Sequence, residues 1–264
     1  MNNSINSSDT IIIKVGTNVI ATKDGLPDHE AMQNIADQIV RLKKHYKRVV
    51  LVSSGAVAFG RSEYNQAQQD NETTKEKQKL ASAGQGLLIE AWRECFRGKC
   101  IVGQVLCEKE HFDNEKSSRN IQNTIESGFK EEENTISIVN ENDSAATEEL
   151  MFYDNDHLSY MLAKLLNANR VVFASCMNGV QRDVNDSEST IPSFEYKDKS
   201  WKKYVPKEAV SINGRGGMYV KCLVSRNLQG LGVTSYIING REENALVRLL
   251  IDGEPLGTVF LPKT

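Results

Sequence analysis

The chain has 264 residues, of which 39% are hydrophobic and 25% charged, with a formal net charge of −3 and a pI near 5.9. This composition is that of an ordinary globular protein and gives no electrostatic reason to expect nucleic acid or an anionic membrane as a partner. No apolar run approaches the roughly 20 residues that span a bilayer. The N-terminal segment MNNSINSSDT lacks the charged and apolar regions of a signal peptide. We therefore expect a cytoplasmic protein with no membrane partner.

The cysteines predict neither a disulfide framework nor a zinc site. Their number is odd and no CxxC pair occurs among them, so reduced thiols are expected. They are Cys95, Cys100, Cys107, Cys176 and Cys222. The four histidines form no cluster in the sequence either, and no metal-ligating set is predicted.

Apolar, β-branched runs alternate with helical patterns along the chain. Buried strands are predicted at 11–15, 49–53, 100–107, 136–139, 171–175 and 233–238. Helices are predicted from an Asp28 cap to about residue 46, directly after the strand 49–53, around residues 80–92, after residue 107, over 155–167, and after a glycine-rich turn at 214–217. The polar segment 183–201 reads as an irregular exposed excursion, and 256–262 as an edge strand that ends the sheet.

Strands that alternate with helices in this way predict an α/β fold, specifically a three-layer α/β/α sandwich around a mainly parallel sheet. No internal repeat or Pro-rich linker divides the chain. We expect a flexible N-terminal tail over residues 1–9 and one domain over residues 10–264.

Three glycine-rich turns follow or precede predicted elements at one edge of the sheet. The segments are KVGTN with Lys14, VSSGA with Ser54 and Gly55, and NGRGGMYVK with Lys221. Ligands of open α/β sheets bind outside the carboxyl ends of the strands, where free backbone N–H groups can hold an anion. A glycine after a strand is more often a simple turn residue than part of a ligand site, so each turn alone is weak evidence for ligand binding. Neither a P-loop nor a GxGxxG dinucleotide motif is present.

Two loops rich in amides and carboxylates are more specific. SIVNENDSAA follows the predicted strand 136–139, and FYDNDHL precedes the predicted helix 155–167. Asn and Asp at such positions also act as turn residues and helix caps, and Asp154 can be such a cap. Together with the lysine-bearing turns, the loops offer donors and acceptors for a zwitterionic substrate and an aspartate that could organise the lysines.

The motifs KVGTN, VSSGA, KLASAGQGLL, VNENDS, DNDHL and GRGGMYVK resemble, in order and approximate spacing, those of the glutamate 5-kinase branch of the amino acid kinase family. The resemblance implies ATP-dependent phosphorylation of the γ-carboxylate of L-glutamate, with ATP and Mg²⁺, as the first step of proline biosynthesis. It also leads us to expect a homo-oligomer, and a short form that lacks the C-terminal RNA-binding-like domain of many such kinases.

The resemblance also implies roles for individual residues. Lys14 and Lys221 would contact the transferring phosphoryl group, and Asp156 would hold both lysines. The substrate-binding residues would be Ser54, Gly55, Asp143 and Asn155. The nucleotide would lie against Lys14, Gly16, Thr17, Ser175, Cys176, Gly216, Gly217, Met218 and Lys221.

The chain departs from the family pattern beside the nucleotide. Ser175-Cys176 stands where Thr-Asp is usual, Gly179-Val180-Gln181 replaces Gly-Leu-Tyr, and Arg215 replaces a small hydroxyl residue. Two alternatives stay open. One is a related kinase acting on acetylglutamate, carbamate, aspartate or a nucleoside monophosphate, and the other is a weakly active protein that senses glutamate, proline or a nucleotide.

Overall fold

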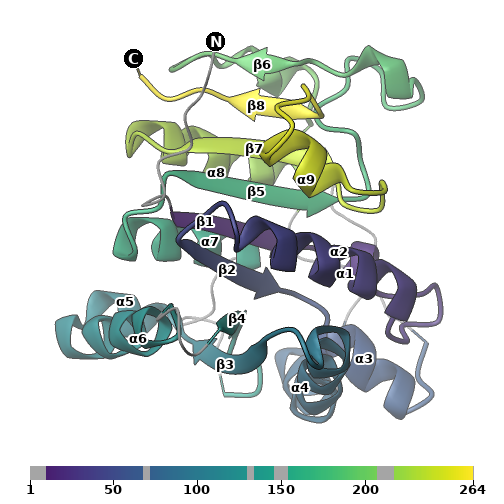
Figure 1. Ribbon diagram of the computed structural model, residues 1–264. Helices are drawn as coiled ribbons and strands as arrows, with labels where there is room; N and C mark the ends of the chain where they lie inside the picture. The colour runs from purple at the N-terminus through teal and green to yellow at the C-terminus, as the bar shows by residue number, and fades with distance from the viewer. Residues whose placement is uncertain (1–9, 68–71, 130–133, 146–153, 207–216, 264) are drawn as a thin grey trace.

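The computed structural model describes residues 10–67, 72–129, 134–145, 154–206 and 217–263. Within these residues the strands form one eight-stranded sheet in the order β3-β4-β2-β1-β5-β7-β8-β6 (Figure 1). The strands are β1 Thr10–Val15, β2 Arg48–Ser53, β3 Ile101–Cys107, β4 Thr135–Glu141, β5 Arg170–Ser175, β6 Ser193–Phe194, β7 Thr234–Asn239 and β8 Thr258–Phe260. The pairs from β3 across to β7 are parallel, so the mainly parallel sheet predicted from the sequence is confirmed.

Helices cover both faces of this sheet (Figure 1). They are α1 Thr17–Ile20, α2 His29–Leu42, α3 Ala56–Glu63, α4 Thr74–Phe96, α5 Lys109–Asp113, α6 Glu115–Ser127, α7 Asn155–Leu165, α8 Met218–Gly230 and α9 Ala245–Leu250, with short 3₁₀ helices η1 Ser187–Ser189 and η2 Ser200–Lys203. Successive strand residues point to opposite faces. In β1, Ile11 and Ile13 pack with α2, α4 and α9, whereas Ile12 packs with α7 and α8. The three-layer α/β/α sandwich is therefore confirmed.

Most predicted elements are found within a few residues of their expected positions. The Asp28 side chain caps α2 by accepting a hydrogen bond from the Ala31 N–H at 3.1 Å, as predicted. The helix ends at Leu42 rather than at residue 46. All five cysteines are free; Cys95, Cys107 and Cys222 are buried. Residues 1–9, which the sequence analysis assigned to a flexible tail, lie outside the described residues.

Two predictions about the far side of the sheet were wrong. Strand β8 is not the edge strand, because it lies between β7, to which it is antiparallel, and β6. The edge is β6, which belongs to the segment 183–201 that was predicted to be an exposed excursion. This segment also buries Trp201 completely. Although the segment is mostly polar, a few apolar residues in it are buried by contacts with residues that are distant in sequence. Helices α1 and α9 were not predicted either.

Helices α3 and α4 cross with their backbones in direct contact. A Cβ atom at Gly84 would lie 1.9 Å from the Ala56 carbonyl oxygen and 2.2 Å from the Gly60 nitrogen. Helix α3 begins directly after Gly55, whose φ of 125° favours glycine. This close crossing therefore fixes α4 against the turn that carries Ser54 and Gly55.

The crossing predicts opposite effects for two glycines of the same helix. Gly84→Ala should destabilise the protein by about 1–3 kcal/mol, because its methyl group overlaps backbone atoms that cannot move independently. Gly86→Ala is the matched control, since among the described residues no atom outside the helix's own backbone and the adjacent residues lies within 4 Å of the added methyl group. It should stabilise by about 0.5–1 kcal/mol through helix propensity. Urea denaturation of both variants measures the difference, and equal stabilities would contradict the close contact.

Candidate active site

Lys14, Asp156 and Lys221 meet at the carboxyl edge of the sheet, and we call them the charge triad. Oδ1 of Asp156 lies 2.9 Å from Nζ of Lys14, and Oδ2 lies 3.0 Å from Nζ of Lys221. Lys14 comes from the end of β1, Asp156 from the first turn of α7 and Lys221 from the first turn of α8. Asp156 is completely buried, and the two lysines are 5% and 7% exposed. The structure thus brings together three residues that are up to 207 positions apart, the separation between residues 14 and 221.

Burial and mutual attraction compete in this triad. Burial alone would raise the pKa of Asp156, but the two ammonium groups outweigh it and lower the pKa to about 2. Burial lowers the pKa of Lys14, and the attraction of Asp156 offsets only part of this effect. For Lys221 burial also acts to lower the pKa, yet the hydrogen-bonded Asp156 carboxylate outweighs it and the pKa rises. With all three groups ionised, the triad carries a net charge of +1 in a buried position, which suits an anionic ligand.

Asp154 sets the start of α7. Its Oδ1 accepts hydrogen bonds from the backbone N–H groups of Asp156 and His157, each at 3.0 Å. The predicted cap at Asp154 is therefore confirmed. The Nδ1 atom of His157 also lies 3.0 Å from this oxygen. The cap fixes the first turn of the helix, and with it the direction in which Asp156 faces the lysines.

A cluster of amides and a hydroxyl lies next to the charge triad. The Asn155 side chain donates to Oγ of Ser54 at 2.9 Å and to Oδ1 of Asn140 at 2.8 Å. The Asn140 side chain donates in turn to Oε1 of Gln85 on α4 at 2.8 Å. The structure thus places the sequence-predicted Ser54 and Asn155 together. Gln85 was not predicted to lie in this cluster, although it belongs to the KLASAGQGLL motif.

The turn after β1 is tied to the neighbouring strands. The N–H of Gly16 donates to the Ala174 carbonyl at 3.2 Å, and the N–H of Ser54 donates to the Val15 carbonyl at 3.1 Å. Thr17 is the first residue of α1, which follows Gly16 directly.

The remaining predicted site residues lie at two other turns. Gly217 precedes α8, Met218 is its first residue, and Asp143 lies half-buried in the turn after β4. Gly216 and Arg215 lie outside the described residues.

The sequence profile described as "Amino acid kinase family" matches residues 9–239. The chain belongs to the amino acid kinase family. It is 37% identical over 257 residues to a glutamate 5-kinase from Bacteroides thetaiotaomicron, a match that covers 96% of this chain and 70% of that protein. A glutamate 5-kinase from Thermoanaerobacter sp. is 33% identical over 258 residues, covering 96% and 68% of the two chains.

Solved structures of other proteins share the fold of this amino acid kinase. N-acetylglutamate synthase from Neisseria gonorrhoeae, complexed with coenzyme A and L-arginine, superposes with a TM-score of 0.68 at 12% identity, over 97% of this chain and 62% of that one. The carbamate kinase of Giardia superposes with a TM-score of 0.64 at 16% identity, over 98% of this chain and 100% of that one. At these identities the likeness shows the fold alone. No helix among the described residues is long and apolar enough to cross a membrane.

In the turn after β5 of this amino acid kinase, the Ser175 and Cys176 side chains both donate hydrogen bonds to backbone carbonyls. The Ser175 hydroxyl donates to the Met177 carbonyl at 3.2 Å, and the thiol of Cys176 donates to the Asn18 carbonyl at 3.0 Å. Arg241, in the turn after β7, donates to the same Asn18 carbonyl through Nε at 3.0 Å and one terminal nitrogen at 2.9 Å. Sequence reasoning did not single out Arg241, because nothing local in the sequence links it to the turn after β1.

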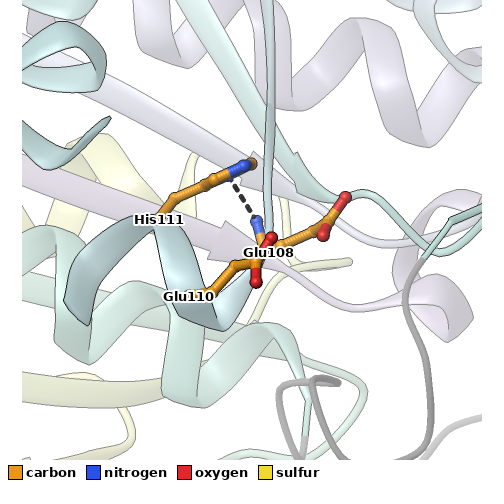
Figure 2. A group of neighbouring side chains, drawn as sticks. All are labelled: Glu108, Glu110 and His111. Carbon is orange, nitrogen blue, oxygen red and sulfur yellow. Dashed lines mark hydrogen bonds between the residues drawn. The ribbon is translucent and has the colours of Figure 1, made fainter. Parts of the chain in front are cut away.

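A second group of carboxylates and a histidine lies at the start of α5 (Figure 2). Glu108, Glu110 and His111 are close enough together to hold a metal ion. However, Nδ1 of His111 accepts the backbone N–H of Glu108 at 3.0 Å (Figure 2). Oε1 of Glu108 accepts a hydrogen bond from the Asn142 side chain at 2.7 Å. The group is thus occupied in capping a short helix and in holding the turn after β4.

The lowered pKa of Asp156 predicts a pH-dependent contribution to stability. Since its folded pKa of about 2 lies below the ordinary 3.8, the stabilisation is complete above about pH 4 and is lost as the pH falls towards 2. Asp156→Asn leaves two buried ammonium groups without a counter-ion and should cost about 3–5 kcal/mol at pH 7. The difference from wild type should shrink steadily below pH 4.

Urea denaturation from pH 7 to 2.5 measures this difference. Asp37→Asn is the control, since it removes an exposed carboxylate that pairs with Lys99 at 2.6 Å and should change stability by less than about 1 kcal/mol. A wild-type advantage over Asp156→Asn that is constant from pH 7 to 2.5 would contradict the assigned ion pairs.

Proposed function

We propose that this amino acid kinase transfers the γ-phosphoryl group of MgATP to the side-chain carboxylate of L-glutamate, giving γ-glutamyl phosphate as the first step of proline biosynthesis. The observation that carries the proposal is the buried charge triad beside the Ser54–Asn155 cluster. The triad suits the transferring phosphoryl group, and the cluster suits a polar amino acid. The glutamate 5-kinases that the chain resembles over 96% of its length support the same choice of substrate.

The chemistry needs little beyond position and charge. A side-chain carboxylate has a pKa near 4.3, so the nucleophile is already ionised at neutral pH and no general base is required. The obstacle is repulsion between this carboxylate and the phosphates of ATP. Lys14 and Lys221 offset that repulsion and stabilise the charge on the transferring group. Asp156 holds both ammonium groups in place and reduces their mutual repulsion.

The substrate would lie against Ser54, Gly55, Asn155 and Asp143. The hydroxyl and amide groups suit its carboxylates, while the carboxylate of Asp143 suits its ammonium group. In this arrangement each charged group of the substrate faces a protein group of complementary character. The side-chain carboxylate of the substrate is then directed to the charge triad.

The phosphates would lie along Gly16 and Thr17 and at the start of α8, where Gly217 is the N-cap and Met218 the first helical residue, so that their backbone N–H groups have no acceptor within the helix. Gly216 would extend this surface. Ser175 and Cys176 would border the base or ribose. The Cys176 thiol is already committed to the Asn18 carbonyl, which supports a weaker discrimination of the base than a carboxylate would give.

Mg²⁺ would enter with ATP and neutralise phosphate charge. Both oxygens of Asp156 face lysines, so the phosphate oxygens would supply most of its ligands. Oδ2 of Asp154 is buried and accepts no hydrogen bond from the described residues. An oxygen of this kind suits Mg²⁺ or one of its waters.

We further propose that residues 10–264 act as one kinase domain, that the protein works in the cytoplasm, and that it forms a homo-oligomer. No nucleic acid or membrane partner is proposed, because the net charge is only −3.

The alternative of a nearly inactive sensor is supported by Cys176 at a position where the family has aspartate. The retained charge triad supports an active enzyme, since a binder needs no charge pair for a transition state.

The decisive assay is ADP release with MgATP and, in turn, L-glutamate, N-acetylglutamate and L-aspartate. L-Glutamate should be the preferred substrate. Lys14→Ala and Lys221→Ala should each lower turnover about 100- to 1,000-fold or more while the protein stays folded, because each removes a charge aimed at the transferring group.

Lys43→Ala is the matched control. Lys43 is half-buried, and it donates to the Thr135 carbonyl at the opposite, amino edge of the sheet, at 2.6 Å. It should retain nearly wild-type turnover. A folded Lys14→Ala enzyme with wild-type turnover would remove that lysine from the mechanism, and faster turnover of N-acetylglutamate or L-aspartate would overturn the choice of substrate.

A further inference from the structure

The amide cluster beside the charge triad has an orientation that its chemistry forces. The backbone N–H of Glu141, which can only donate, points at Oδ1 of Asn155 at 3.3 Å. The NH₂ group of Asn155 must therefore face the other way, where it donates to Ser54 Oγ and to Asn140 Oδ1. Because each amide has one acceptor end and one donor end, fixing the first fixes the next.

The same polarity passes to Gln85. With its oxygen engaged by Asn155, Asn140 turns its NH₂ group to Oε1 of Gln85 at 2.8 Å. The Gln85 side-chain oxygen thus accepts the hydrogen bond from Asn140, and its NH₂ group remains available to donate to another partner. Among the described residues, none accepts a hydrogen bond from this NH₂ group or from the Ser54 hydroxyl. The chain Glu141–Asn155–Asn140–Gln85 thus ends in donors that have no acceptor within the described protein.

Donors without acceptors at a half-buried position match a ligand that carries only acceptors. A carboxylate is such a ligand, whereas a carboxamide places its own NH₂ group against these donors. Sites that leave a buried polar group unpaired discriminate strongly against the wrong analogue. The polarity of the cluster therefore favours an acidic over an amidated substrate.

Two features place Gln85 at the far end of the hydrogen-bonded amide chain from the charge triad and hold it there. Asn155 is the chain neighbour of Asp156 in the charge triad, and Asn140 separates Gln85 from Asn155. Helix α4 is fixed by the Gly60–Gly84 backbone contact, one residue before Gln85. A rigid helix thus presents the donor at a fixed position, which is what selective recognition needs.

We propose that Gln85 is a specificity-determining residue that donates a hydrogen bond from its side-chain NH₂ group to the α-carboxylate of the amino acid substrate. The orientation of Asn155 and Asn140 keeps this NH₂ group turned towards the ligand. The proposal rests on the proposed function, because the γ-carboxylate must lie at the charge triad for the α-carboxylate to reach Gln85.

The test compares L-glutamate with its α-amide, L-isoglutamine, as phosphoryl acceptors and as ligands. Gln85→Glu keeps an oxygen for Asn140 but replaces the donor by a second acceptor. It should raise the KM for L-glutamate about 10- to 100-fold with little change in the KM for ATP. It should also raise the ratio of kcat/KM for L-isoglutamine over L-glutamate by at least about tenfold.

Two further variants separate the loss of the donor from the effect of the added charge. Gln85→Ala removes the donor without adding charge and should raise the KM for L-glutamate without favouring L-isoglutamine. Gln122→Glu on α6, where Gln122 donates to the half-buried Glu126 at 3.0 Å, controls for the added charge and should leave both constants unchanged. Calorimetric titration with L-glutamate in the absence of ATP repeats the comparison independently of turnover.

The outcomes separate the two proposals. If wild type phosphorylates L-glutamate and Gln85→Glu keeps the wild-type KM and selectivity, the role of Gln85 is overturned and the proposed function stands. If wild type releases no ADP with L-glutamate, the proposed function fails. In that case the calorimetric affinities still decide whether Gln85 selects the α-carboxylate, and equal affinities of wild type and Gln85→Glu for L-glutamate would overturn it.

Discussion

Two buried ammonium groups share one buried carboxylate at the carboxyl edge of the sheet, and the site depends on this arrangement. Removing three charges from water is unfavourable, and the attraction within the charge triad repays it only if the distances stay short. Strand β1, helix α7 and helix α8 must therefore come together in one register for Lys14, Asp156 and Lys221 to meet at 2.9 and 3.0 Å. The same contacts that stabilise the fold leave a net positive charge, which is what an anionic reaction centre requires.

The rest of the site is arranged around this charge. The Asp154 cap fixes the first turn of α7, so it orients both Asp156 and Asn155. Asn155 then links the triad to Ser54 and to the amide chain that ends at Gln85. A single helix start thus positions the groups that would handle the phosphoryl group and the groups that would handle the amino acid.

The turn after β1, where the nucleotide is proposed to bind, is held in place by backbone acceptors rather than by an amide chain. The Asn18 carbonyl, in α1, accepts hydrogen bonds from both Cys176 and Arg241, and Arg241 also pairs with Asp28 at 3.0 Å. These contacts hold the turn after β1 against the turns after β5 and β7. Cys176, where the family resemblance leads one to expect aspartate, therefore has a partner of its own in this chain.

The sequence predicted those parts of the molecule that local pattern determines. Continuous apolar runs such as 11–15 and 49–53 predicted buried parallel strands, and the turn after the first run placed Lys14 at the carboxyl edge. The family resemblance, not local pattern, predicted that Asp156 would hold Lys14 and Lys221. The sequence failed where structure depends on distant contacts: β8 lies inside the sheet, and β6 is the edge strand, because of pairings that no local pattern specifies. Gln85 was missed for the same reason, since its partner Asn140 is 55 positions away. A glutamine in an amphipathic helix carries no signal of its own.

The central claim is that this site joins the γ-phosphoryl group of ATP to a side-chain carboxylate. It is tested most directly with L-glutamate labelled with ¹⁸O in that carboxylate, in a reaction with MgATP and hydroxylamine. Hydroxylamine attacks the carbonyl carbon of an acyl phosphate, forming a hydroxamate and releasing phosphate that keeps the bridging oxygen. Phosphate carrying one ¹⁸O atom, detected by ³¹P NMR, is the predicted result, whereas phosphate without ¹⁸O would show that ATP is hydrolysed by water and would contradict the account.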